Sequence, residues 1–165
     1  MKTEIRSMTA TDWGDVSAIY LAGMATGQAT FETKLPTWEN WNKAHLPAPR
    51  LLAVFEESIV GWAALSPVSV RAVYAGVAEV SVYVAAEMRG QGVGLLLLKS
   101  LIPQSEKNGV WTLQAGIFPE NSASISLHKS CGFREVGRRE RVAKMNGIWR
   151  DTLLFERRSA LAGAD

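Results

Sequence analysis

Residues 77–84 alternate: Val80, Val82 and Val84 fall on one face, and Glu79, Ser81 and Tyr83 fall on the other. Side chains of a β-strand point alternately to opposite faces, so this period of two predicts a strand. Further strands are predicted at residues 3–7, 51–55, 59–65, 111–118, 133–143 and 148–155. Two short breaks, Glu56-Glu57-Ser58 and Asn146-Gly147, predict hairpins.

Apolar residues return every three or four positions in four other segments, which predicts helices. The first follows a cap at Thr11 or Asp12 and ends near Gly27, and a short second helix follows a cap at Thr37. The third covers residues 92–107 and the fourth residues 123–131. Because an interior proline costs about 3 kcal/mol, we expect a bend or a broken last turn at Pro103.

The resulting order is strand, two helices, hairpin, strand, helix, strand, helix, hairpin. This order predicts one α/β (α+β) domain with a mixed sheet, and 165 residues is an ordinary length for one domain. We therefore expect a single domain over residues 1–165, with a flexible tail from about residue 158.

Composition narrows the class of protein. The chain is 47% hydrophobic and 21% charged, which favours a globular protein over a disordered one. Its net charge of +2 is too balanced for a protein that coats nucleic acid or an acidic membrane, so neither is an expected partner. A single cysteine, Cys131, and two histidines give no credible metal site. Without a signal-peptide pattern or a long apolar segment, we expect a cytoplasmic location.

A glycine-rich loop, Arg89-Gly90-Gln91-Gly92-Val93-Gly94, joins the 77–84 strand to the helix that follows it. Glycines let the backbone approach a ligand closely, and the free N–H groups of a helix N-terminus attract phosphate. The spacing fits neither the dinucleotide-binding fingerprint nor a P-loop, because the acidic residue of the first and the Lys-Ser/Thr of the second are absent. The loop therefore predicts a phosphate-containing ligand of another kind.

Two motifs in the chain resemble those of the GNAT superfamily of N-acetyltransferases. The first, Arg/Gln-x-x-Gly-x-Gly/Ala after a splayed strand, is matched by Arg89, Gly92 and Gly94. The second, an asparagine followed by a helix and Gly-Phe, is matched by Asn121 and by Gly132-Phe133. Residues 79–84 and 146–151 look more narrowly like the phosphinothricin and methionine sulfoximine N-acetyltransferases. The similarity spans residues 5–155 and implies a GNAT-like, mixed, largely antiparallel sheet with a splayed strand pair, flanked by about four helices.

The resemblance implies direct transfer of acetyl from acetyl-CoA to the α-amine of a small amino-acid-like substrate of the phosphinothricin, methionine sulfoximine or methionine sulfone type. It also implies a homodimer. Acetyl-CoA would lie along the splayed strand and the glycine loop, and a backbone N–H near Tyr83 or Val84 would stabilise the oxyanion. The residues implied for the cofactor are Val82, Tyr83, Val84, Arg89, Gly90, Gln91, Gly92, Val93, Gly94, Leu95, Asn121 and Ser124.

The candidate general base is Glu79, because a carboxylate among valines on an interior strand would otherwise carry a desolvation cost. The alternative to a catalytic role for Glu79 is a solvated carboxylate or a salt-bridge partner. His128 stands where many family members place a tyrosine as general acid, and a histidine packed beside the cofactor is the alternative. Tyr83 is a second candidate acid or a packing residue.

The resemblance also suggests a substrate wall. The residues implied for it are Phe31, Arg71, Val73, Tyr74, Glu79 and Ser81. Arg71 offers a planar fork for a carboxylate, and a solvated loop arginine is its alternative. The mixed run Arg138-Arg139-Glu140-Arg141 predicts a solvated strand face.

Two other functions stay open on the sequence. One keeps the chemistry and changes the acceptor to a polyamine, an aminoglycoside or a protein N-terminus; here Arg71 favours an anionic acceptor. The other is an acetyl-CoA sensor without turnover, against which the presence of Glu79 weighs.

Overall fold

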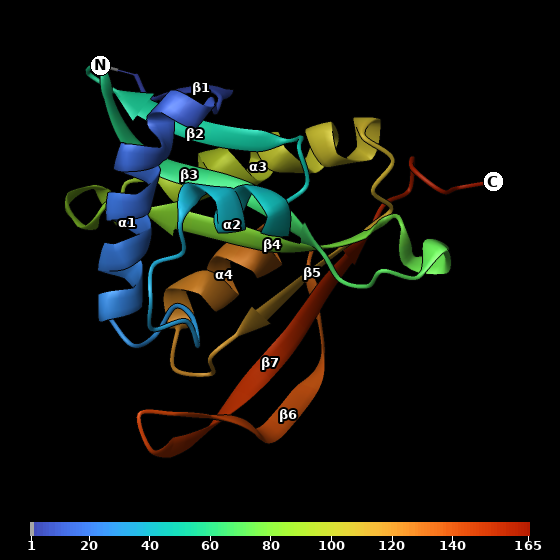
Figure 1. Ribbon diagram of the computed structural model, residues 1–165. Helices are drawn as coiled ribbons and strands as arrows, with labels where there is room; N and C mark the ends of the chain where they lie inside the picture. Colours follow the sequence, from blue (N-terminus) through green and yellow to red (C-terminus); the bar gives the residue numbers. More distant parts are fainter. Residues whose placement is uncertain (1) are drawn as a thin grey trace.

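The computed structural model describes residues 2–165. These residues contain one mixed sheet of seven strands (Figure 1). The strands are β1 (Glu4–Ser7), β2 (Arg50–Phe55), β3 (Ser58–Pro67), β4 (Val77–Val84), β5 (Thr112–Ile117), β6 (Arg134–Met145) and β7 (Ile148–Arg158). The helices of these residues are α1 (Trp13–Ala25), α2 (Trp38–Ala44), α3 (Val93–Lys107) and α4 (Ser122–Ser130). The element order and the mixed α/β class that the sequence predicts are confirmed.

The sheet order is β1-β2-β3-β4-β5-β7-β6, and only the central pair β4–β5 is parallel. The two strands pair over only three residues each, Val77–Glu79 of β4 with Thr112–Gln114 of β5. Beyond that point β4 continues to Val84 and β5 to Ile117 without pairing to each other. The predicted splayed strand pair is therefore confirmed, and it opens the middle of the sheet.

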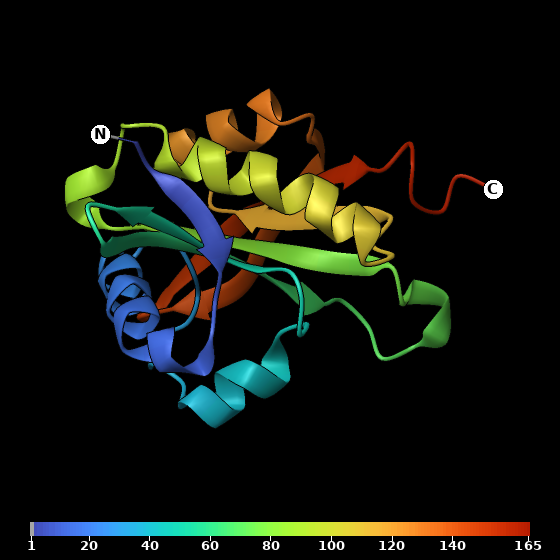
Figure 2. The ribbon, with the colours of Figure 1, turned by 90° about the horizontal axis from the view of Figure 1, so that it is seen from above.

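The helices form two layers: α3 and α4 cover one face of the sheet, and α1 and α2 lie on the other (Figure 2). The core between α3 and the sheet includes the fully buried Leu97, Leu98 and Leu101. Contrary to the expectation of a broken last turn, α3 continues through Pro103 to Lys107. Proline removes one N–H from the helix, and the buried leucine stripe holds the remaining turns against the sheet.

The helix starts are built from different side chains. Thr37 caps α2 as predicted, because its hydroxyl accepts the N–H of Asn40 at 3.2 Å. Asp12 precedes α1, but its carboxylate does not cap that helix. It accepts two guanidinium N–H groups of Arg6, at 2.8 and 2.9 Å, and the N–H of Thr9 at 2.8 Å. Asp12 therefore ties β1 to the start of α1.

The two predicted hairpins turn through residues with positive φ, Glu56 and Glu57 in one and Asn146 and Gly147 in the other. This is the geometry of the tight turns that match strand twist. Strand β6 also carries a bulge, where its register with β7 shifts between Arg139 and Ala143.

The chain after β7 contacts the body of the protein. Ser159 is buried and its N–H donates to the carbonyl of Trp111 at 2.8 Å. The Ser159 hydroxyl also bonds Glu106, and Arg158 donates to the carbonyl of Ala162 at 2.9 Å. A flexible tail from residue 158 stays a prediction.

Candidate active site

A cavity of about 960 Å³ begins at the loop before α3, follows β4 and the splay, and ends against the β6–β7 hairpin. Of the predicted cofactor residues, all but Gln91 line it; the Gln91 side chain instead donates to the carbonyl of Glu87 at 3.1 Å. Of the predicted substrate residues, Phe31, Glu79 and Ser81 line the cavity. The structure therefore brings together residues from the middle, the N-terminal third and the C-terminal third of the chain.

The loop before α3 is shaped by Gly90 and Gly92, whose φ angles are +75° and +82°. A Cβ built on either glycine would meet no atom within 4 Å. Glycine is thus favoured here by the left-handed backbone rather than by crowding, and the space in front of the loop is open. Gly92 is the N-cap residue of α3, so the first N–H groups of this long helix point toward that space. The arrangement fits a phosphate group.

The splay exposes backbone groups of β4 toward β5. The N–H of Ala85, which follows β4, donates to the carbonyl of Val60 at 2.8 Å. Successive N–H groups of an extended chain point to alternate sides, so Tyr83 directs its N–H toward β3 while Val84 directs its N–H into the splay. Of the two backbone groups expected near the reacting carbonyl, the geometry therefore favours that of Val84.

Asn121 is the N-cap of α4, where its side-chain oxygen accepts the N–H of Ser124 at 3.1 Å. Its side-chain N–H donates to the carbonyl of Gln28, also at 3.1 Å. Asn121 thus holds the loop after α1 against the start of α4, at the edge of the cavity that it lines.

His128 is buried on α4 and lines the cavity. Its Nδ1 lies 2.7 Å from the carbonyl oxygen of Ser124, so this nitrogen carries the proton. Burial lowers the pKa of the imidazole below its usual value. At pH 7 the ring is therefore neutral and its Nε2 accepts hydrogen bonds, which fits poorly with the expected role of general acid.

Tyr83 points its ring toward α1. The ring stacks on Trp62 at 4.9 Å between centroids, and Tyr20 lies at the same distance. A Cβ at Gly23 of α1 would lie 2.6 Å from the Tyr83 ring, so only glycine allows the helix this close. Burial raises the pKa of the Tyr83 hydroxyl, which makes it a weaker acid than free tyrosine. These contacts favour the packing role.

Glu79 is exposed within the cavity, and Gln114 of β5 donates to it at 3.3 Å. These two residues are direct partners in the short paired stretch of β4 and β5. Glu79 and Ser81 share the sheet face that carries Tyr83, on the side of α1 and α2. Among the described residues Glu79 takes part in no ion pair, and its carboxylate faces the cavity.

Arg71, Val73 and Tyr74 do not line the cavity. They belong to the exposed segment between β3 and β4, drawn green in Figures 1 and 2, which lies at the end of the molecule away from α1 and α4. The Arg71 guanidinium lies 5.5 Å from the centre of the Tyr74 ring.

Sequence reasoning missed several cavity residues. They include Tyr20, Trp41, His45, Gln114, Phe118, Arg139, Thr152 and Leu154. Gln114 could have been found from the alternation of residues 111–118, which sets it on the opposite face from Leu113 and Ala115. Trp41 and His45, stacked at 4.1 Å, enter the cavity only because α2 packs over β3 and β4. No local pattern indicates that placement.

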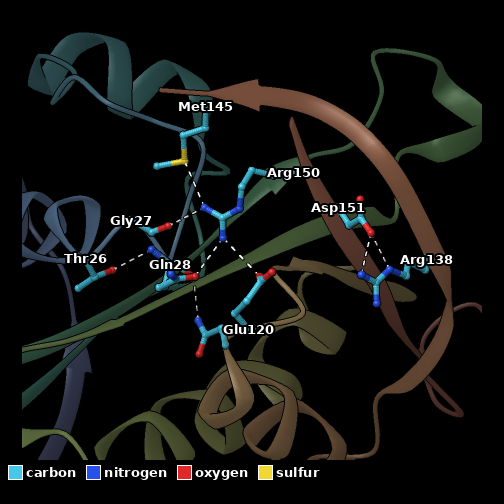
Figure 3. A network of polar contacts seen from close by, with 9 residues as sticks. Thr26, Gly27, Gln28, Glu120, Arg138, Met145, Arg150 and Asp151 are labelled. Atoms are coloured by element: carbon cyan, nitrogen blue, oxygen red, sulfur yellow. Dashed lines mark hydrogen bonds and ion pairs between the residues drawn. The ribbon is translucent and has the colours of Figure 1, made fainter. Parts of the chain in front are cut away.

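A polar network centred on Arg150 lies beside Phe118, which lines the cavity. Arg150 of β7 donates to the carbonyl of Gly27 at 2.9 Å and to the side chain of Gln28 at 3.0 Å, and it lies 3.4 Å from Glu120 (Figure 3). Phe31, a few residues along the same loop, packs edge-on against Phe118 at 4.9 Å. The β6–β7 hairpin thereby fixes the loop that forms one wall of the cavity.

Among residues 2–165, no cluster of three or more His, Cys, Asp or Glu side chains is placed to hold a metal ion. No helix in the same part of the chain combines the length and the apolar character needed to cross a membrane.

Comparison with known proteins relates the chain to one family and to three individual proteins. The profile of the acetyltransferase (GNAT) family matches residues 15–133. Phosphinothricin N-acetyltransferase of Alcaligenes faecalis is 34% identical over 161 residues, which cover 93% of this chain and 81% of that protein. The crystal structure of a GNAT superfamily phosphinothricin acetyltransferase from Sinorhizobium meliloti in complex with AcCoA matches with a TM-score of 0.89 and 26% identity, over 100% of this chain and 92% of that one. The crystal structure of ribosomal-protein-alanine N-acetyltransferase from Brucella melitensis matches with a TM-score of 0.86 and 33% identity, over 94% and 99% of the two chains.

Proposed function

Because this chain belongs to the GNAT family of acetyltransferases, we propose that it moves the acetyl group of acetyl-CoA to the α-amine of a small amino-acid-like acceptor. The observation that carries the proposal is the single cavity that joins the glycine loop, the splay and Glu79. A cavity that holds both substrates at once suits direct transfer, in which the amine attacks the thioester without a covalent enzyme intermediate.

The glycine loop and the splay fit acetyl-CoA. The N–H groups at the start of α3 suit its pyrophosphate, and the free backbone of residues 82–84 suits a strand-like arm. When bound, acetyl-CoA supplies the thioester carbonyl that the amine attacks. The N–H of Val84 would then donate to the carbonyl oxygen as negative charge develops on it.

Glu79 is the proposed general base. Its carboxylate is exposed to the cavity, on the sheet face where the acceptor would lie, and Gln114 orients it. It would take a proton from the ammonium group of the acceptor, directly or through water.

We propose that the CoA thiolate leaves without protonation by a general acid. His128 is neutral with its Nδ1 proton committed to Ser124, and burial raises the pKa of Tyr83. We propose that His128 positions ligands from α4 and that Tyr83 shapes the cavity wall, since a thiolate is a good leaving group.

An amino-acid-like acceptor is supported by the Alcaligenes faecalis relative, whose name gives phosphinothricin as its substrate. A protein N-terminus is the second candidate, because the Brucella melitensis structure is named for a ribosomal-protein alanine. A cavity of about 960 Å³ has room for either a free amino acid or the end of a peptide.

The test is a screen of acceptors with acetyl-CoA, in which free CoA is measured. It should include phosphinothricin, methionine sulfoximine, methionine sulfone, a polyamine, an aminoglycoside and a short peptide that begins with alanine. We expect the amino-acid analogues to give the highest kcat/KM. If the peptide gave a higher kcat/KM than every amino-acid analogue, the acceptor would be a protein N-terminus. If no acceptor released CoA above the background rate, an acetyl-CoA sensor would be favoured.

We further propose that residues 1–165 form one acetyltransferase domain that works as a cytoplasmic homodimer. One body of sheet and helices supports the first part. Sedimentation equilibrium would test the dimer.

A further inference from the structure

The acceptor half of the cavity contains an arginine that no described residue neutralises. Arg139 of β6 lines the cavity, whereas Arg71, the arginine expected to bind the carboxylate, does not. We propose that Arg139 is the group that binds the carboxylate of an amino-acid acceptor. This inference rests on the proposed function and names a determinant of its specificity.

The orientation of Arg139 follows from the sheet register. Arg139 is the direct partner of Thr152, and Gln114 is the partner of both Glu79 and Glu156. Directly opposed residues point to the same face of a sheet, and residues two apart on one strand do as well. Thr152 and Glu156 are four apart on β7, so Arg139 and Glu79 lie on one face, that of α1 and α2. An acceptor on this face meets a carboxylate from β4 and a guanidinium from β6.

Asp151 of β7 fixes the part of β6 that carries Arg139, at the start of the bulge. Asp151 accepts the side chain of Arg138 at 2.8 Å on one side of Arg139 and the N–H of Arg141 at 2.7 Å on the other (Figure 3 shows the Arg138 contact). Arg141 has a φ of +47°, which the Asp151 bond supports. One carboxylate therefore holds both ends of the segment that carries Arg139, and Val142, just beyond this segment, also lines the cavity.

Several arginines of β6 and β7 form ion pairs, and Arg139 does not. Arg134 pairs with Glu156, Arg138 with Asp151 and Arg150 with Glu120. Within residues 2–165, Arg139 takes part in no ion pair and in no cation–π contact. An arginine on a cavity wall with its five N–H groups uncommitted suits a carboxylate, which it binds in a planar fork.

Two other cationic side chains, those of Arg89 and Lys34, line the cavity. Arg89 belongs to the glycine loop, at the opposite end from the β6–β7 hairpin. Lys34 lies on the irregular loop between α1 and α2. A lysine on a loop loses more side-chain freedom on binding than an arginine on a clamped strand, and it lacks the fork. Arg139 is therefore the better-placed group.

The test compares an acid with its neutral ester. L-methionine sulfone and its methyl ester are offered to the wild type and to Arg139→Ala, Arg139→Lys and Lys34→Met, with free CoA measured. Arg141→Ala is the matched control, since it removes the same charge from the same strand outside the cavity. Because the Arg139 side chain has no ion-pair partner, its variants should keep the wild-type circular dichroism and melting temperature.

We expect Arg139→Ala to lower kcat/KM for the acid by roughly 10- to 100-fold, as for loss of a charged hydrogen bond, and to change the ester by less than about three-fold. Arg139→Lys should recover part of the loss, and Arg141→Ala should match the wild type. Calorimetry with the product N-acetyl-L-methionine sulfone should show a similar acid-specific loss of affinity.

Equal losses for acid and ester, no loss for either, or an acid-specific loss in Lys34→Met instead of Arg139→Ala would each overturn the assignment of Arg139. None of these results would contradict the proposed acceptor class, because the wild type would still acetylate the amino acid. If the wild type acetylated neither compound, the proposed acceptor class would fall, and with it this inference.

Discussion

The guanidinium carbon of Arg150 lies 3.9 Å from the centre of the Phe118 ring, so a residue of β7 stacks on the residue that follows β5. From this position Arg150 also reaches the carbonyl of Gly27 and the side chain of Gln28. One side chain thus joins the C-terminal hairpin, the end of β5 and the loop after α1.

Replacing Arg150 by methionine keeps the packing volume and removes the bonds to Gly27 and Gln28. We expect a loss of about 1–3 kcal/mol in the free energy of unfolding, measured by urea denaturation. The KM for the acceptor should rise roughly ten-fold or more because the loop wall is displaced, while the KM for acetyl-CoA changes less. The control is Arg134→Met, which removes an exposed ion pair and should cost less than about 1 kcal/mol. Equal effects of the two substitutions on the acceptor KM would contradict the role of Arg150.

Gly92→Val should weaken acetyl-CoA binding by at least roughly ten-fold in calorimetry. Gly92 has a φ of +82°, which a β-branched residue adopts poorly, and a side chain would stand in the space before α3. Gly109 provides the matched control, since its φ is +80° and its surroundings are equally open, but it lies outside the cavity. Gly109→Val should carry the same backbone strain with unchanged affinity. If both variants bound acetyl-CoA equally well, the glycine loop would not be its phosphate site.

Glu79→Gln keeps the shape of the side chain and removes its ability to take a proton. Loss of a general base typically lowers rates by about 10²–10⁴-fold, so kcat should fall by that much. Affinity for acetyl-CoA, measured by calorimetry, should be retained. Glu135→Gln, an exposed carboxylate outside the cavity, serves as the control. Near-normal turnover by Glu79→Gln between pH 6 and 9 would remove Glu79 from the role of base.

Asp12 should make the free energy of unfolding decrease at acidic pH. Its hydrogen bonds with Arg6 hold the pKa of the Asp12 carboxyl well below its usual range. A carboxyl whose pKa is lower in the folded state stabilises the protein fully above its unfolded pKa of about 3.9, and this contribution is lost as the pH falls further. Asp12→Asn should therefore destabilise the protein by about 1–3 kcal/mol at pH 7 and by progressively less below pH 4.

Urea denaturation at a series of pH values measures this dependence. Asp15→Asn, an exposed carboxylate in the first turn of α1, is the comparison and should have a small effect throughout. A constant difference between Asp12→Asn and the wild type from pH 7 down to pH 3 would contradict the assignment.

Much of the fold was predictable because its signals are local. The alternation of residues 77–84 and the break at Asn146-Gly147 are each read within a few residues, and both are confirmed. Pro103 shows the limit of such rules, since its local cost is outweighed by burial of the leucines on α3.

The site was predictable only where its residues follow one another along the chain. The glycine loop and Glu79 lie in one strand–loop–helix segment, so the sequence indicates them together. Arg71 and Arg139 show why the rest was not predictable. The sequence suggests that Arg71 is a carboxylate ligand or a solvated loop arginine and that Arg139 belongs to a solvated strand face, and only the strand order decides which one lines the cavity. That order, with β7 between β5 and β6, depends on pairing between distant residues.

The short pairing of β4 and β5 also bears on how this protein avoids aggregation. Beyond Glu79 and Gln114, each strand is bonded on one side and free on the other, so the sheet contains two free edges in its interior. Free strand edges are templates on which other chains add strands. Here the two edges face each other between two layers of helices, so a foreign strand would have to enter between them, whereas an edge on the outside is open to any partner. The enzyme can therefore keep unpaired strands ready for a narrow, extended ligand without offering them to its neighbours.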